Sequence, residues 1–514
     1  MNTSQYDEKV HEPLDDKNAY TPLKNDPTRS NERSLLAKLR DLRKKNKICQ
    51  YVYDRVKPSE GSSRPALFYG LVKLHKPSVP LGPVVSACGT AIYNLARFLS
   101  SIIRPLVGSS GRNLKNTEDL VESMKEVTLD EDEILVSYDV KNLFTNIPVA
   151  ESVEICNKRL LADVTLSERT TMDVATIIDL LRFCLTSTSF RYDNQHYKQL
   201  DGLAMGSPVS PVMADIFMGN FEDNALIDET VKPRIWKRFV DDIISVVKKS
   251  QSNRLLSHLN TQHKKIQFTM EEEKDGSLPF MDVRFTRKLN GELEREVYQK
   301  PTHTNRYVHF TSHHPISVKS GVIDCLMYRA TTVASSDDIL RKETARVVET
   351  MRQNGYPKCF TERVISKQRK RTGQERQGRK RNDDEPMEQA NIPFVDGVSQ
   401  EIKRIARSAG IHCTFFTPST TRSLYNVKDR LPAGSRTHAV YAVTCQTCGE
   451  HYVGETLRSV EVRCKEHKDA IRLGQTAKSA IAEHVHGQIN THVIDWQHVQ
   501  IVNGARRTRE RKTR

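Results

Sequence analysis

Three aspartates at the ends of apolar, strand-like runs are the feature that most constrains this chain. Asp139 lies in the run Val136–Val140, and the adjacent pair Asp241 and Asp242 closes Phe239–Asp242. Such runs predict strands that end or turn at one sheet edge, where three carboxylates can converge. Hard divalent cations prefer oxygen ligands, so the pattern outlines a two-metal phosphoryl-transfer site with magnesium ions roughly 4 Å apart. The alternative is an acidic hairpin turn, in which Asp-Asp is common.

The segments between these aspartates favour the catalytic interpretation. Phe144, five residues after Asp139, is placed for its ring to lie under an incoming sugar and exclude a 2′-hydroxyl, which favours deoxynucleotides. Gly202–Pro211 predicts a glycine-containing turn leading into an apolar helix, whose backbone approaches a template and primer closely. Its alternative is an ordinary loop-to-helix cap. The residues of this turn expected to contact nucleic acid are Gly206, Ser207 and Pro208.

In this order and spacing, the three segments resemble polymerase motifs A, B and C of reverse transcriptases. Four further segments resemble signatures of Penelope-like retroelement polyproteins, which join a telomerase-related reverse transcriptase to a C-terminal GIY-YIG endonuclease. These segments are Tyr69–Pro77, Leu278–Val283, Pro301–Tyr307 and His314–Val322. The resemblance runs from about Ala66 to the last residue and implies a right-hand α/β polymerase fold.

The same resemblance implies an RNA-directed DNA polymerase of a retrotransposon. It would extend the DNA 3′-hydroxyl of a nicked target on an RNA template, with deoxynucleoside triphosphates as substrates. Asp139, Asp241 and Asp242 would bind the two Mg²⁺ ions. RNA would be held mainly through its backbone charge and shape.

Composition and resemblance together predict a series of domains. The expected order is a polar, helical extension over 1–60; a reverse transcriptase over 61–355, with fingers at about 61–130, palm at about 131–300 and thumb at about 301–355; a basic linker and connector over 356–430; and a GIY-YIG-like domain over 431–514. Within the extension, Ser34–Arg40 is an apolar helical patch that could dock on the polymerase. The linker carries the basic runs Lys367–Arg371 and Arg379–Arg381, read either as a nuclear-import signal and nucleic-acid tether or as a solvated charge run.

Charge and cysteine content agree with an intracellular protein that binds a polyanion. Lys and Arg number 79 against 64 Asp and Glu, and the net charge of +15 predicts nucleic-acid binding that weakens with salt. The ten cysteines are scattered, which argues against a disulfide framework. Since no apolar run reaches membrane-spanning length and the N-terminus is not a signal peptide, we expect synthesis in the cytoplasm and action in the nucleus, with no membrane partner.

The C-terminal segment carries a second set of candidate residues. Val440–Tyr441 and Tyr452–Gly454 stand where GIY-YIG nucleases place two short strands, and Arg463 and His467 follow at i, i+4 on one helix face. The resemblance implies that Tyr441 or Tyr452 assists deprotonation of the attacking water, that Arg463 steadies the phosphorane charge, and that His467 helps proton transfer. A divalent metal would be required. Without the resemblance, such residues on a basic surface are more often simple contacts.

A cysteine pair between the two tyrosines predicts a structural zinc site. The resemblance favours Cys445, Cys448, His484 and His492 as ligands, with His486 as the rival histidine. Without downstream histidines, a Cys-x-x-Cys pair is more often inert or redox-active.

Three departures from the family pattern weaken the expected activities. Gly82 replaces an arginine that would clamp the incoming triphosphate, and the single ammonium of Lys73 cannot copy a bidentate guanidinium. Ala439 replaces the usual glycine of the first endonuclease motif. The chain also ends where the metal-binding glutamate of the nuclease is expected; Glu510 is the nearest carboxylate and is not judged equivalent. The first departure predicts weakened nucleotide binding, and the two in the nuclease segment predict little or no DNA nicking.

Two other functions stay open at this point. A catalytically decayed nucleic-acid-binding remnant is favoured by Gly82 and opposed by the intact aspartates. A telomerase-like host polymerase at chromosome ends is opposed by the nuclease-like C-terminal segment.

Overall fold

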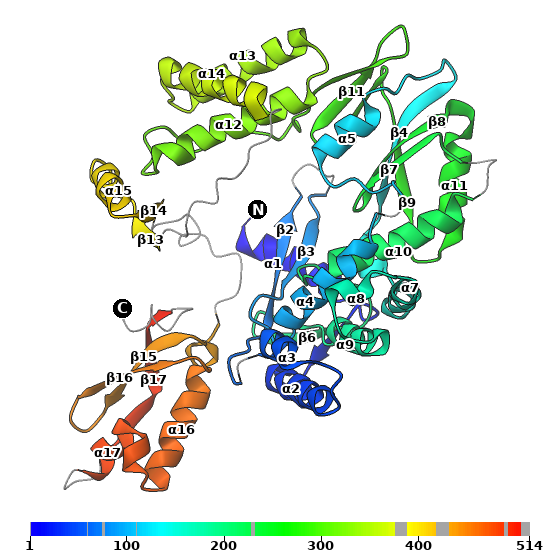
Figure 1. Cartoon of the computed structure of the whole chain (residues 1–514). Helices are drawn as coiled ribbons and strands as arrows, with labels where there is room; N and C mark the ends of the chain where they lie inside the picture. Colours follow the sequence, from blue (N-terminus) through cyan, green and yellow to red (C-terminus); the bar gives the residue numbers. More distant parts are fainter. Residues whose placement is uncertain are drawn as a thin grey trace.

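The computed structural model describes residues 2–58, 60–73, 78–108, 110–227, 232–375, 388–417, 431–487 and 492–504. Helices and strands alternate along these residues, and the strands form separate sheets covered by helices (Figure 1). The expected α/β class is therefore confirmed. Within the described part of the chain, no helix is both long and apolar enough to cross a membrane.

A four-stranded antiparallel sheet forms the expected palm. Its order is β7 (Ile235–Phe239), β8 (Asp242–Lys248), β4 (Glu133–Val140) and β9 (Phe268–Glu272). Alternate residues of β4 point to opposite faces, because side chains in a strand repeat every two residues. Val136 and Tyr138 join one hydrophobic core, whereas Leu135 joins another.

The first palm core is mainly helical. It packs the sheet against helices that include α7 (Val149–Leu161), α9 (Val174–Thr186) and α10 (Ser210–Ala225). Shorter or flanking elements complete this region: α6 (Leu143–Asn146), α8 (Leu166–Arg169), α11 (Ser252–Gln262), η1 (Arg104–Leu106) and η2 (Lys249–Gln251).

The second palm core lies on the other face of the sheet. Leu135, Ile244 and Val246 pack there against α5 (Thr117–Met124) and a three-stranded sheet. That sheet consists of β10 (Ser277–Phe280), β11 (Val283–Arg287) and β12 (Leu293–Val297).

A five-stranded sheet, called the fingers sheet below, combines strands from the ranges expected to be the N-terminal extension, the fingers and the palm. Its order is β1 (Tyr20–Leu23), β6 (Gln195–Gln199), β5 (Ser189–Tyr192), β2 (Ala66–Val72) and β3 (Leu81–Ser86). Tyr20 of β1 is buried against Phe190, and α1 (Thr3–Leu14) packs Val10 and Leu14 into the same core. Within the expected N-terminal extension, residues 3–23 thus contribute a strand and a helix to this sheet and its core.

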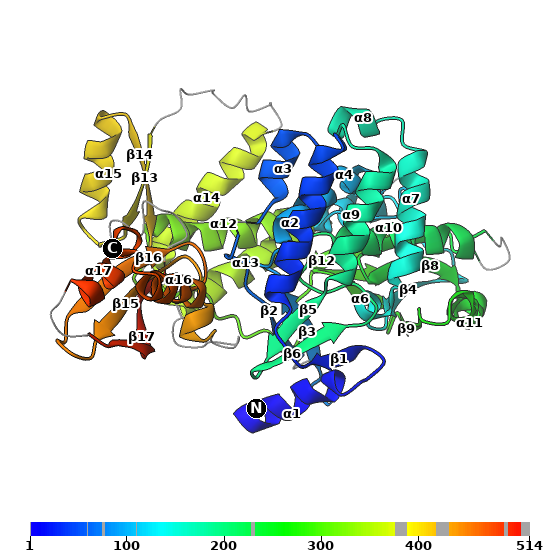
Figure 2. The ribbon, with the colours of Figure 1, turned by 90° about the horizontal axis from the view of Figure 1, so that it is seen from below.

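The apolar patch at Ser34–Arg40 does lie in a helix that docks on the polymerase. α2 (Thr28–Lys44) buries Leu35 and Leu39 in the first palm core, and Figure 2 shows it grouped with α3 (Gln50–Val56) and α4 (Tyr93–Ile103).

Three helices follow the palm. They are α12 (Ile316–Val333), α13 (Asp337–Gln353) and α14 (Lys358–Glu375), which share a core of their own. α14 extends through Lys367–Arg371, where the basic composition predicted a linker. The reason is that Phe360, Val364 and Ile365 give it an apolar face that packs on the bundle. The second basic run, Arg379–Arg381, lies outside the described residues.

The expected connector also contains a folded unit. β13 (Glu388–Pro393) and β14 (Ile411–Phe416) pair in parallel, and α15 (Ser399–Ser408) connects them. Parallel pairing requires such a crossover.

The C-terminal domain is a three-stranded antiparallel sheet with helices (Figure 1). Its elements are β15 (Ala439–Cys445), β16 (His451–Thr456), β17 (Ile494–Gly504), α16 (Val460–Arg472), α17 (Ala480–His486), η4 (Ala433–Ser435) and η5 (Thr476–Lys478). The two expected short strands correspond to β15 and β16, which place Tyr441 opposite Gly454. Glu510 lies outside the described residues.

Candidate functional sites

The structure brings the three predicted aspartates to one edge of the palm sheet. Asp139 at the end of β4 is the direct register partner of Asp242 at the start of β8, and Asp241 lies in the turn that precedes β8. Directly opposed antiparallel residues have Cα atoms roughly 4.5–5.5 Å apart. The backbone N–H of Val140 donates to the carbonyl of Asp241 at 3.1 Å, which ties this turn to β4.

Strand periodicity also places two of these side chains on one face. Asp139 shares its face of β4 with Leu135, and Asp242 shares its face of β8 with Ile244; both apolar residues belong to the second palm core. Asp242 is exposed and Asp139 is half-buried. Carboxylate oxygens at this sheet edge are the ligand type that Mg²⁺ prefers.

The turn carrying Asp241 contains a strained residue held by a buried arginine. Val240 has a φ of 59°, a left-handed conformation that is unfavourable for a β-branched side chain. Arg238, only 1% exposed, donates to the carbonyl of Val240 at 3.1 Å. The arginine therefore fixes the residue immediately before Asp241.

Arg238 is itself fixed by a polar network. Its guanidinium donates to Glu222 at 2.7 Å, Asp215 at 2.8 Å and Asn113 at 2.8 Å. The indole of Trp236 also donates to Glu222, at 3.0 Å. Burial acts to lower the pKa of Arg238, but the carboxylates of Glu222 and Asp215 raise it.

Sequence reasoning missed this residue, although one signal was present. Arg238 shares the inward face of β7 with Trp236, where a charged side chain requires partners.

The glycine segment packs against protein backbone on two sides. The N–H of Leu203 donates to the carbonyl of Phe144 at 2.6 Å, and the N–H of Val85 donates to the carbonyl of Met205 at 2.7 Å. A Cβ on Gly206, whose φ is 108°, would lie 2.2 Å from the carbonyl oxygen of Val85. We expected this glycine to allow close approach to nucleic acid. In the structure it allows close approach to the backbone of β3.

The remaining predicted contacts lie around this segment. Phe144 is half-buried against the first palm core, Gly206 is exposed, Ser207 is buried, and Pro208 is partly exposed just before α10.

Lys73 and Gly82, the two residues expected near the incoming triphosphate, lie side by side. Leu71 is the register partner of Gly82, and a Cβ on Gly82 would lie 3.2 Å from Cε and 4.0 Å from Nζ of Lys73. An arginine at position 82 would therefore start beside the existing ammonium. Residues 74–77 of this segment lie outside the described residues.

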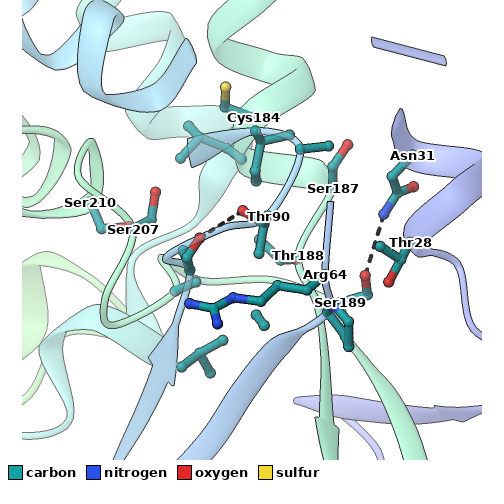
Figure 3. Close-up of a pocket in the computed structure, with 18 residues that line it drawn as sticks. Thr28, Asn31, Arg64, Thr90, Cys184, Ser187, Thr188, Ser189, Ser207 and Ser210 are labelled. Atoms are coloured by element: carbon teal, nitrogen blue, oxygen red, sulfur yellow. Dashed lines mark hydrogen bonds between the residues drawn. The ribbon is translucent and has the colours of Figure 1, made fainter. Parts of the chain in front are cut away.

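A small cavity separates the glycine segment from the fingers (Figure 3). Ser207, Ser210, Thr90 and Arg64 are among its lining residues, and its volume is about 40 Å³, enough for a few water molecules. Because this space is smaller than a nucleotide, we do not assign it to a substrate. Arg64 donates from Nε to the carbonyl of Cys88 at 2.9 Å.

The predicted nuclease residues gather in the C-terminal domain, with two of them buried. The hydroxyl of Tyr441 and Nε2 of His467 are hydrogen-bonded at 2.8 Å, and Nδ1 of His467 and the hydroxyl of Ser479 at 2.7 Å. Tyr441 is 0% and His467 1% exposed. Tyr452 packs its ring edgewise on His467, and Arg463 pairs with Glu466 at 3.0 Å.

Burial sets the protonation of this pair. It raises the pKa of Tyr441 above its usual value. Burial, reinforced by the guanidinium of Arg463, lowers the pKa of His467 to about 4, so the imidazole is neutral at pH 7.

The four predicted zinc ligands converge on one point. The ligand atoms of Cys445, Cys448, His484 and His492 all lie within 4.8 Å of one another. Cys445 Sγ is 3.5 Å from His492 Nδ1, and Cys448 Sγ is 3.5 Å from His484 Nε2. Sulfur and nitrogen ligands of tetrahedral zinc are roughly 3.3–3.8 Å apart, and both cysteine–histidine distances lie in this range. His484 Nε2 and His492 Nδ1 are closer, at 2.9 Å, so the donor types fit zinc but the two rings must separate slightly to bind it.

The surroundings of this cluster also fit a metal. Although burial opposes ionisation, hydrogen bonds from the backbone N–H of Cys448 and from His484 lower the pKa of the Cys445 thiol to about 6. His484 Nδ1 lies 3.4 Å from Glu450, an outer carboxylate that would orient the ring. The rival His486 is hydrogen-bonded to the carbonyl of Ile471 at 2.8 Å and points elsewhere.

Comparison with protein families places two matches along the chain. Residues 92–278 match the family described as reverse transcriptase (RNA-dependent DNA polymerase), and residues 306–366 match the animal helix-turn-helix domain. The first match contains all three aspartates and the glycine segment, and it confirms the expected right-hand polymerase fold. No curated protein sequence matches the chain.

Solved polymerase structures resemble the chain at low sequence identity. Telomerase from Candida albicans in complex with a TWJ fragment of telomeric RNA has 9% identity and a TM-score of 0.43, covering 68% of this chain and 60% of that chain. Apo telomerase from Candida tropicalis has 12% identity and a TM-score of 0.38, covering 60% and 59%. The Sicinivirus 3Dpol RNA-dependent RNA polymerase has 12% identity and a TM-score of 0.39, covering 62% and 71%. The chain thus spans less than two thirds of the telomerases that it resembles.

Proposed function

We propose that the reverse transcriptase domain at residues 92–278 makes this chain an RNA-directed DNA polymerase of a retrotransposon. It extends a DNA 3′-hydroxyl on an RNA template, with deoxynucleoside triphosphates as substrates. The observation that carries the proposal is the β4–β8 register, which sets Asp139 opposite Asp242 with Asp241 in the adjoining turn.

Each candidate residue has a role in this proposal. Asp139, Asp241 and Asp242 hold two Mg²⁺ ions, which when bound would activate the primer 3′-hydroxyl and neutralise the leaving pyrophosphate. Phe144 excludes a 2′-hydroxyl, and Lys73 contacts the triphosphate. The backbone at Gly206, Ser207 and Pro208 aligns template and primer.

Primer extension on an RNA template tests the polymerase proposal. Asp241→Ala should abolish Mg²⁺-dependent incorporation. Asp275→Asn is the matched control, because Asp275 lies in an exposed turn with a φ of 51° that asparagine tolerates. Wild-type protein that adds no nucleotide, or Asp241→Ala protein that adds as many as wild type, would end the proposal.

A catalytically decayed remnant is the second candidate, and the Lys73–Gly82 pair is the observation that favours it. Gly82→Arg would set a guanidinium beside the ammonium of Lys73 and give the triphosphate a bidentate contact. We expect a lower KM for nucleotides in primer extension. No gain from this variant would remove the argument that Gly82 weakens the site.

For the C-terminal domain we propose a GIY-YIG-like DNA-nicking module with weak activity, as in a Penelope-like element. The gathering of Tyr441, Tyr452, Arg463 and His467 supports the module. The burial of Tyr441 and His467, each engaged in an internal hydrogen bond, supports the weakness. The zinc held by the Cys–Cys–His–His group would be structural.

Nicking of supercoiled DNA by the full chain tests this module. We expect a slow, metal-dependent reaction that Arg463→Ala reduces further. Rapid nicking would overturn the proposed weakness, and a rate unchanged by Arg463→Ala would overturn the module. We further propose that the protein acts in the nucleus, bound to its element's RNA; the fraction of tagged protein in the nucleus tests that.

A further inference from the structure

The N-terminal helix α2 and the loop that follows α3 contact the C-terminal domain through a small polar site. Arg29 of α2 donates from Nη2 to the hydroxyl of Ser459 at 2.6 Å. The N–H of Ser459 donates in turn to the carbonyl of Gly61 at 2.9 Å. We call the group Arg29, Glu32, Gly61 and Ser63 the docking site.

Glu32 organises the docking site from within. It is 2% exposed, and its carboxylate accepts from the backbone N–H groups of Gly61 and Ser63. It also pairs with Arg29 at 3.6 Å. A buried carboxylate with these partners holds both the loop and the guanidinium in place. None of these contacts of Glu32 involves the C-terminal domain.

The C-terminal domain meets this site with the beginning of α16. Ser459 is the N-cap of α16 and accepts from the N–H of Val462 at 3.4 Å. Gly61 has a φ of 74°, and a Cβ there would lie 3.0 Å from the side chain of Arg458. The glycine thus allows Arg458 to lie flat on the loop.

The contact continues to a candidate nuclease residue. Arg458 donates to Glu466 at 2.7 Å, and Arg463 donates to the same carboxylate oxygen at 3.0 Å. Arg458, which touches the docking site, and Arg463, which is expected to contact the phosphate of the DNA, therefore share one acceptor oxygen of Glu466.

We infer that the docking site, within residues 28–32 and 61–63 of the polymerase, binds the C-terminal domain. Through Arg458 and Glu466, this contact positions Arg463. This assigns a role to the N-terminal segment whose purpose its sequence does not reveal. Docking fixes the C-terminal domain against the fingers, so that its basic α16 is presented in one orientation relative to the polymerase.

Hydrogen–deuterium exchange on the full chain tests this inference. Arg29→Ala removes the donor to Ser459, and we expect exchange of the amides of residues 459–466 to become about ten-fold faster, the effect of losing one charge-assisted hydrogen bond. Arg33→Ala is the matched control, because Arg33 lies on the exposed face of the same helix. Equal exchange in all three proteins would overturn docking.

A second variant separates docking from simple helix destabilisation. Ser459→Asp keeps an N-cap acceptor for α16 and adds a charge facing Arg29. It should slow exchange in residues 459–466 in the wild-type chain but not in the Arg29→Ala chain. An equal effect in both backgrounds would show that the contact does not couple the two domains. Because exchange needs no template, nucleotide or DNA, this result is independent of the proposed polymerase and nicking activities.

Discussion

At the scale of single residues, the buried Arg238 holds the turn that carries Asp241 at the edge of the palm sheet. The turn at Val240 is unfavourable by itself, since a β-branched residue adopts a positive φ there. Arg238 binds its carbonyl while Glu222 and Asp215 compensate the charge.

Arg238→Lys should therefore reduce both stability and nucleotide incorporation. Lysine keeps the charge but loses the planar set of donors, so we expect the free energy of unfolding in urea to fall by roughly 3 kcal/mol. Displacement of Asp241 should lower the rate of primer extension on the order of 100-fold. Arg234→Lys is the control, because that arginine forms a more exposed pair with Glu133 and should change stability by less than about 1 kcal/mol. Equal effects of the two variants would contradict the role of Arg238.

Gly206 offers a second prediction at this scale. Gly206→Ala places a Cβ 2.2 Å from the carbonyl oxygen of Val85, so the segment must move away from β3. We expect loss of primer extension and a lower melting temperature. Gly276→Ala also has a positive φ, but its nearest atom would be Arg287 Cβ at 3.6 Å, so it should cost only about 1–2 kcal/mol. If Gly206→Ala behaves like Gly276→Ala, the contact with β3 is unimportant.

At the scale of elements, the Cys–Cys–His–His group joins four segments of the C-terminal domain. Cys445 ends β15 and Cys448 lies in the turn before β16. His484 lies in α17, and His492 lies just before β17. We expect one zinc per chain by elemental analysis and a lower melting temperature of the C-terminal domain after chelation. Cys448→Ser should remove the zinc, whereas His486→Ala should retain it. Zinc retained by Cys448→Ser would contradict the assignment.

The packing of α16 on β15 predicts a pH dependence of the same domain. The pKa of His467 is about 4 in the folded chain and roughly 6.5 when unfolded. As the pH falls below 6.5 the unfolded chain takes up this proton first, so the domain loses stability progressively down to pH 4, by at most about 3 kcal/mol. Above pH 6.5 the residue contributes no pH dependence.

The fluorescence of Trp496 in a Trp236→Phe background would follow this unfolding, since these are the two tryptophans of the chain. His467→Gln should flatten the stability profile between pH 4 and 6.5. A profile as steep in His467→Gln as in wild type would assign the effect to other groups.

At the scale of the whole molecule, we expect the net charge of +15 to govern binding to nucleic acid. If the chain neutralises about six to ten phosphates, affinity for an RNA–DNA duplex should fall by roughly 10³–10⁵ between 50 and 200 mM salt. Fluorescence anisotropy across this range measures the slope of log K against log salt. A slope near zero would show that charge does not drive binding.

The placement of candidate residues could be predicted from the sequence where it depends on local pattern. The apolar runs around Asp139 and Asp241 were sufficient to expect strands that meet at one edge, and the structure brings them together. The four zinc ligands were expected from the family resemblance, because ligand types and spacing alone left His486 as a rival. Arg238 was missed because its role depends on tertiary contacts with α10 and with Asn113, which is 125 residues away along the chain.

The amino-acid sequence by itself determined the α/β class, the position of the three aspartates at strand ends and the donor types of the Cys–Cys–His–His group, because strand periodicity and donor chemistry are local properties. Only the tertiary structure decided that β1 completes the fingers sheet, that α14 continues through a basic run, and that α16 rests on Arg29. The reason is that each arrangement depends on burial against another part of the fold. β1 and α16 contact segments far away along the chain, and α14 packs on a helix bundle. Local sequence pattern does not specify these contacts.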